Sequence, residues 1–233
     1  MTNFSHPKCY ARSLNDCSKT ISGEHYISEG ILKQYDGKIL VYGLGQNGRE
    51  ASPNSLTVNV LCTKHNSYLS DFDSEAIKLF STIEKFDKDI DVPDGTYKYQ
   101  EIDGRKLERW ILKASYALAE SGSFQKDNQK MSVNIKEVFL EVLFQGQPFP
   151  KLCGLYFISK LGDKVHVEKS ISIRPITNGE KLIAVEILFR QLGFMLCLEE
   201  PSEPTIRNTF HCPGFIFQDH KETTRREIKL IYT

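Results

Sequence analysis

Three cysteines and a histidine in the first 65 residues are the side chains best suited to holding a metal ion. Segment 61–66 reads LCTKHN and places Cys62 and His65 three positions apart, while Cys9 and Cys17 lie upstream. Structural zinc sites use four thiolate or imidazole ligands in a tetrahedron. These four side chains therefore predict a structural zinc site. The alternative is that Cys9 and Cys17 are ordinary reduced thiols and that His65 packs at a helix start.

Glu24, His25 and Asn66 offer a second kind of chemistry in the same stretch of chain. Oxygen ligands hold a hard divalent cation, and an imidazole accepts a proton near neutral pH. Metal-assisted phosphodiester hydrolysis needs both, with His25 as general base and Glu24 and Asn66 on the cation. Adjacent strand residues point to opposite faces, so the strand must end at this pair for both to reach one substrate. Asn66 has an alternative role as a helix N-cap, which does not exclude metal binding.

The order of these residues resembles the HNH, or ββα-metal, nucleases. The pattern Cys…Cys…Glu-His…Leu-Cys-x2-His-Asn is most similar to the recombination endonuclease VII type, in which a zinc-binding Cys-x2-Cys is followed at once by a metal-binding asparagine. Over residues 9 to 75, the resemblance implies His25 as general base, Glu24 and Asn66 on one catalytic Mg²⁺ or Mn²⁺, and the four Cys and His side chains on zinc. It also implies cleavage of nucleic acid. Glu24 stands where this family more often has aspartate.

Short strands and one helix are expected around these residues. Alternating and β-branched runs between turns rich in Gly, Asn and Pro predict strands at Thr20–Tyr26, Ile39–Tyr42 and Thr57–Leu61. From Asn66, apolar residues recur every three or four positions and predict a helix to about Lys85. Asp71 and Asp73 on this helix are interpreted as a solvated cluster that complements the helix dipole. Approach of these two carboxylates to the cation is the alternative.

The rest of the chain predicts helices followed by an antiparallel sheet. After an acidic linker at Asp87–Gly95, helices are expected at Arg105–Ser121 and Val133–Phe144. Strands are expected at Gly154–Ser159, Lys164–Glu168, Ile171–Ile176, Leu182–Phe189, Phe194–Leu198 and Glu227–Tyr232. The predicted class is α+β. A zinc-stabilised ββα-metal, treble-clef-like module occupies residues 1–86, and a helical plus antiparallel β domain occupies residues 96–233.

Composition indicates an ordinary globular protein. The chain has 233 residues, of which 40% are hydrophobic, and these suffice for a core. No apolar run reaches membrane-spanning length and no secretory signal is recognised, so a cytoplasmic location is expected. Thirty basic residues balance thirty acidic ones, whereas nucleic-acid binders usually carry a cationic surface. A basic patch formed only in space, or bound cations, would meet that need.

These features together predict a metal-dependent HNH-type endonuclease that hydrolyses phosphodiester bonds, with duplex DNA as the expected substrate. Host defence or mobile-element processing would suit it by family analogy. Residues 96–233 would orient substrate or bind a protein partner, and no membrane partner is expected. One alternative is a non-catalytic zinc-binding module that binds nucleic acid or a protein partner. The other is a regulatory or scaffold subunit whose working part is residues 96–233.

Overall fold

The two predicted strands nearest the cysteines form an antiparallel pair. In the computed structural model, β1 (Ile21–His25) pairs with β4 (Thr57–Cys62) so that Ile21 lies opposite Cys62. The register is irregular between Ser22 and Glu24, and β1 ends at His25. Both strands were predicted to within one residue of these bounds. Their pairing brings the Glu-His pair and the LCTKHN segment to the same part of the molecule.

Two helices, rather than one, follow β4. α2 (Thr63–Tyr68) begins directly after Cys62, and α3 (Ser70–Lys88) begins after Leu69. The Leu69 N–H bonds the carbonyl of Asn66, three residues back, which tightens and ends the last turn of α2. The prediction of one continuous helix was therefore wrong at Leu69. The apolar period continues across the break, because Leu69 is fully buried, and periodicity alone did not reveal it.

A six-stranded sheet contains strands from both ends of the chain. Its order is β3 (Arg49–Ala51), β2 (Ile39–Tyr42), β9 (Ser170–Asn178), β10 (Lys181–Phe189), β11 (Leu192–Cys197) and β8 (Gly154–Phe157). β2 pairs with β9 in parallel, and the other neighbours are antiparallel. The turn at Asn178-Gly179 joins β9 to β10, and Gly179 has a φ of +61°, a conformation that favours glycine. The C-terminal antiparallel strands are thus confirmed, and a strand predicted within residues 1–86 joins their sheet.

A second sheet has three strands, in the order β12 (Gly214–His220), β13 (Thr224–Ile231) and β5 (Tyr97–Asp103). β13 was predicted, whereas β5 and β12 were not. Along β5 the large side chains of Tyr97 and Tyr99 point outward and each is 51% exposed, so the apolar residues of this strand do not mark its buried face. β5 runs parallel to β13 and leads directly into α4 (Gly104–Glu120).

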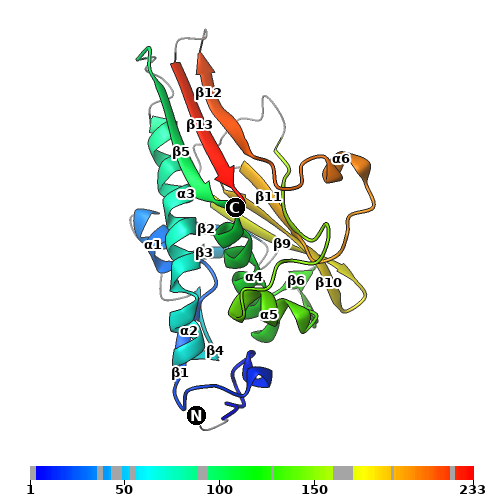
Figure 1. Ribbon diagram of the computed structural model, residues 1–233. Coiled ribbons are helices and arrows are strands. Elements are labelled where there is room, and N and C mark those ends of the chain that lie inside the picture. Colours follow the sequence, from blue (N-terminus) through cyan, green and yellow to red (C-terminus); the bar gives the residue numbers. More distant parts are fainter. Residues whose placement is uncertain are drawn as a thin grey trace.

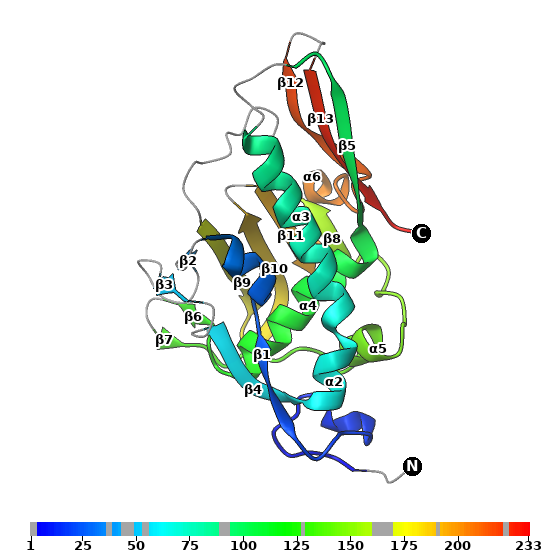
Figure 2. The same ribbon diagram turned by 90° about the vertical axis from the view of Figure 1, so that its left-hand side faces the viewer.

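α4 is the central helix. Most of it is buried, and α3 and α4 lie against one face of the six-stranded sheet (Figure 2). The Trp110 ring on α4 stacks on Phe189 of β10 at 5.7 Å and is fully buried in the core. α3 runs from the β1–β4 end of the molecule toward the three-stranded sheet (Figure 1). Helix α4 therefore forms a shared core with residues from the N-terminal and the C-terminal parts of the chain.

A shorter helix than predicted precedes the C-terminal strands. α5 spans Val138–Phe144, so the predicted helix at Val133–Phe144 begins five residues too early. Asn134 instead forms a bridge with Lys181, and its backbone bonds both Glu180 and Leu182. The remaining short elements are η1 (Arg12–Leu14), α1 (Glu29–Leu32), η2 (Lys33–Tyr35), β6 (Gln125–Lys126), β7 (Gln129–Lys130) and α6 (Pro204–Arg207).

The structure describes residues 4–35, 39–42, 49–52, 56–88, 94–126, 129–159, 170–189, 192–220 and 224–233. The strand predicted at Lys164–Glu168 lies outside these ranges. Across the same ranges, none of the helices combines the length and the apolar character needed to cross a membrane.

Candidate metal centre and adjacent pocket

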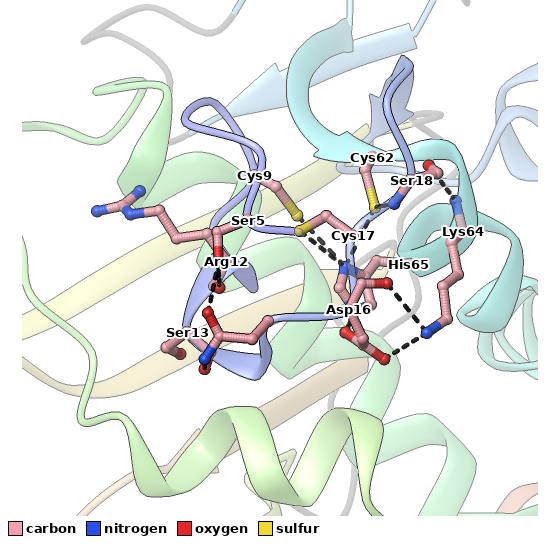
Figure 3. Close-up of polar contacts among 11 residues, drawn as sticks. Ser5, Cys9, Arg12, Ser13, Asp16, Cys17, Ser18, Cys62, Lys64 and His65 are labelled. Atoms are coloured by element: carbon pink, nitrogen blue, oxygen red, sulfur yellow. Dashed lines mark hydrogen bonds and ion pairs between the residues drawn. The ribbon is translucent and has the colours of Figure 1, made fainter. Parts of the chain in front are cut away.

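The four predicted zinc ligands meet in one buried cluster. The sulfur atoms of Cys9, Cys17 and Cys62 and a ring nitrogen of His65 all lie within 4.8 Å of one another. His65 Nδ1 is 3.2 Å from Cys62 Sγ, 3.4 Å from Cys9 Sγ and 3.9 Å from Cys17 Sγ (Figure 3). Zn–S and Zn–N bonds of about 2.3 and 2.0 Å at tetrahedral angles separate sulfur from nitrogen by roughly 3.5 Å. The cluster could therefore hold a metal ion and is compatible with structural zinc.

Local backbone structure explains how the wide spacing between Cys9 and Cys17 still allows both to reach the cluster. The turn of 3-10 helix at Arg12–Leu14 ends in Asn15, which adopts the left-handed conformation with a φ of +56°. Phe4 then pairs with Asp16, which closes the segment back on itself. Cys62 ends β4 and His65 lies on the first turn of α2, so the remaining two ligands come from the strand-to-helix junction.

Hydrogen bonds around the cluster orient its ligands. His65 Nε2 lies 2.9 Å from Asp16 Oδ1, and Lys64 forms an ion pair with the same carboxylate (Figure 3). With Nε2–H donating to Asp16, Nδ1 carries the lone pair that faces the three sulfurs. The backbone N–H of Ser18 donates to Cys62 Sγ at 3.3 Å. Carboxylate support of a histidine and N–H donation to a thiolate are both typical of the surroundings of metal ligands.

The pKa values of the clustered side chains show how readily each one reaches the protonation state that binds a metal ion. Burial raises the pKa of the Cys9 thiol to about 12. Burial also acts to raise the pKa of Cys62, but hydrogen bonds from the His65 and Ser18 backbone outweigh it and the pKa is lowered. Burial lowers the pKa of His65, although the Asp16 carboxylate acts in the opposite direction. A bound cation favours thiolate and neutral imidazole, which is the protonation state that metal coordination requires.

A pocket of about 350 Å³ adjoins this centre, and all three predicted catalytic residues line it. Its walls are formed by Gly23, Glu24, His25, Ser28, Glu29, Gly30, Asn66, Ser67, Ser70, Asp73, Ile77 and Lys113. The sequence-based grouping of Glu24, His25 and Asn66 is thus matched by their positions in space. The pocket is mostly polar in its side chains, and it lies at the end of β1 beside the second half of α2 and the start of α3.

An irregular strand end explains how two adjacent residues can face one pocket. The register of β1 against β4 shifts between Ser22 and Glu24, and the strand stops at His25. Asn66 stabilises this irregularity, because its Nδ2 donates to Ser22 Oγ at 2.9 Å and to the Gly23 carbonyl at 3.2 Å. The alternative role of Asn66 as a helix N-cap was wrong, because Cys62 holds the N-cap position of α2 and Asn66 lies within the helix. Its amide group instead fixes the strand that carries Glu24 and His25. Because Nδ2 makes these bonds, the carbonyl oxygen Oδ1 is the atom suited to a cation.

His25 contributes an imidazole nitrogen that no described side chain or backbone group satisfies. Its Nε2 is buried and has no hydrogen-bond partner among the described residues, while the side chain as a whole is only partly buried and lines the pocket. Buried polar atoms in proteins are nearly always bonded. The His25 ring thus combines an unsatisfied, buried nitrogen with a place in the lining of a pocket that could admit a water molecule or substrate.

The Glu24 carboxylate is buried and forms an ion pair with a buried lysine. It is 1% exposed, and its Oε1 lies 2.7 Å from Nζ of Lys113 on α4. Burial raises the pKa of Glu24 to about 7, while Lys113 acts to lower it and Asp73 to raise it. Asp73 binds the same ammonium at 2.5 Å, so the interpretation of Asp73 as solvated was wrong, whereas Asp71 is 77% exposed as predicted.

Sequence reasoning missed Lys113, although a signal was present. It lies three residues after Trp110 and one before Ala114, within the apolar face of α4, and a lysine at such a position needs a buried partner. Asp16 was missed too, because an acidic residue next to a cysteine has no distinctive spacing.

Comparison of the chain with protein-family models, with curated proteins and with solved structures gave no significant match.

Proposed function

We propose that this protein is a metal-dependent endonuclease of the HNH, or ββα-metal, type. The observation that carries the proposal is the convergence of His25, Glu24 and Asn66 on one pocket beside a Cys₃His cluster. Two antiparallel strands followed by a short helix, with metal-ligand side chains at the junction, support the same assignment. In this account zinc occupies the cluster and stabilises the module that carries the pocket.

Each pocket residue has a role that its position supports. His25 accepts a proton from a water molecule on its imidazole ring, which makes the water a nucleophile toward a phosphodiester. Glu24 and Asn66 supply oxygen ligands for one Mg²⁺ or Mn²⁺ ion. When bound, that ion offsets negative charge on the phosphate and on the leaving oxygen. Asn66 directly follows His65 in the chain, so zinc bound to His65 would also hold the Asn66 carboxamide in place.

Duplex DNA is the substrate we favour, and residues 96–233 would orient it or bind a protein partner. The chain has no net charge, so attraction of the phosphate backbone depends on the bound cations and on local basic groups. Host defence or mobile-element processing stays a prediction by family analogy.

Supercoiled plasmid provides the direct test. Zinc-loaded protein with Mg²⁺ or Mn²⁺ is expected to nick or linearise it, and chelation of the added cation should stop the reaction. His25→Ala and Asn66→Ala should lower the cleavage rate by about 10²- to 10⁴-fold, the usual cost of losing a general base or a catalytic ligand. His6→Ala, a histidine outside the pocket, is the matched control.

Equal cleavage by all variants would contradict the proposal and would indicate another site or a contaminant. A zinc-loaded wild-type protein that never cleaves would favour the non-catalytic zinc-binding module instead.

A further inference from the structure

Lys113 is an ammonium group buried between two carboxylates from different elements. It lies on α4 and is 3% exposed, while Glu24 on β1 and Asp73 on α3 lie 2.7 and 2.5 Å from its Nζ. Burying an unpaired charge is costly, and removal of one member of a buried pair leaves the other uncompensated. The three side chains therefore hold one another in place.

Further hydrogen bonds fix Asp73 itself. Its Oδ1 accepts a bond from Ser28 Oγ at 2.5 Å, and Ser28 Oγ accepts one from Trp110 Nε1 at 2.8 Å. Ser28 precedes α1 but makes no side-chain cap to that helix, so its hydroxyl serves this network. A continuous chain of contacts thus runs from the buried Trp110 ring through Ser28, Asp73 and Lys113 to Glu24.

This chain ends at the pocket wall. Glu24, Ser28, Asp73 and Lys113 all line the pocket that also contains His25. When both carboxylates are ionised, the two acids and the one ammonium together carry a single negative charge. This charge attracts a divalent cation. Without the ammonium, two buried carboxylates would repel each other and lose their fixed positions.

We propose that Lys113, held by Asp73, is a positioning residue that fixes the Glu24 carboxylate where the catalytic cation binds. The inference rests on the function proposed above and adds a residue that the HNH-like pattern does not contain. Lys113 takes no part as acid, base or ligand. Its effect on catalysis acts through the geometry of Glu24.

The test compares Lys113→Met and Asp73→Asn with wild type in the full-length, zinc-loaded protein. Lys106→Met is the matched control, because Lys106 lies on the same helix and is 41% exposed. Two quantities are measured. The first is the dissociation constant of Mn²⁺, obtained by electron paramagnetic resonance. The second is the Mn²⁺ concentration that gives half-maximal plasmid cleavage. We expect both values to rise about tenfold to a hundredfold in the two variants, as for losses of residues that orient metal ligands. Zinc content and the Lys106→Met values should stay at wild-type level.

Several outcomes separate this inference from the proposed function. If wild type cleaves DNA and both variants match it in Mn²⁺ response, the inference is overturned while the function stands. If wild type binds Mn²⁺ but does not cleave, the endonuclease proposal fails, and the binding comparison still decides the role of Lys113. If Lys113→Met does not fold, Asp73→Asn decides, because asparagine keeps the shape of the side chain and the bond from Ser28.

Discussion

Asp16 shows how much a single side chain outside the ligand set can matter. Its carboxylate bonds His65 Nε2 at 2.9 Å, which directs the other ring nitrogen toward the three sulfurs. Asp16→Ala is expected to lower zinc affinity by about tenfold to a hundredfold, because the imidazole loses its orienting partner. Competition with a zinc-binding chromophore measures the change. Asp71→Ala, which removes a carboxylate that is 77% exposed, is the control, and equal losses in both variants would contradict this role.

The residue types and spacings predicted the four side chains of the Cys₃His cluster and the three that share the adjacent pocket, but not the residues that contact them. Cys62, His65 and Asn66 lie within five consecutive positions, so their possible roles as metal ligands were recognisable from the sequence. Asp16 and Lys113 act on residues 49 and 89 positions away, since Asp16 contacts His65 and Lys113 contacts Glu24. Such partners are set by tertiary packing, which a single sequence does not reveal.

Helix α5 connects the later part of the chain to the Cys₃His cluster. Its last residue, Phe144, packs its ring against His65 at 4.8 Å and also contacts Tyr10 and Tyr68. Arg109 on α4 fixes this region by donating to the Val142 carbonyl at 3.1 Å. The end of α5 therefore covers one side of the Cys₃His cluster.

Phe144→Ala is expected to destabilise the zinc-loaded protein by about 2–3 kcal/mol, through lost apolar burial and lost ring contacts. It should also speed zinc release to a chelator, because the ring shields His65. Urea denaturation and stopped-flow chelation measure the two effects. Val138→Ala changes an exposed residue at the other end of α5, 41% exposed, and should have little effect on either. Unchanged zinc release in Phe144→Ala would show that α5 does not cover the centre.

Elements with a clear apolar period were predictable, and those without one were not. α4 and the strands β9, β10 and β11 bury regular apolar faces, and their bounds fall close to the predicted ones. β5 was missed because its tyrosines face outward, where they pair with basic side chains: Lys229 lies over the Tyr99 ring at 4.0 Å. The bulge at the end of β1 was required for the predicted site, and only the pairing with β4 reveals it.

The N-terminal and C-terminal parts of the chain share both a sheet and a core. β2 pairs with β9, and Trp110, the single tryptophan of the chain, donates to Ser28 beside the pocket. We therefore expect metal removal to lower the unfolding temperature reported by Trp110 fluorescence, although Trp110 lies outside residues 1–86. One cooperative transition is expected with and without chelator. If the unfolding temperature reported by Trp110 is the same with and without chelator, the result would instead support independent domains at residues 1–86 and 96–233.

In the proposed site, one tightly held ion keeps an imidazole and a carboxamide beside a second, exchangeable ion. Anomalous diffraction from crystals soaked in Mn²⁺, with data collected on both sides of the zinc edge, tests it most directly. We expect zinc on Cys9, Cys17, Cys62 and His65, and a separate manganese peak in the pocket bounded by Glu24, His25 and Asn66. A cluster of metal-free thiols, or a pocket without manganese at saturating concentration, would contradict it.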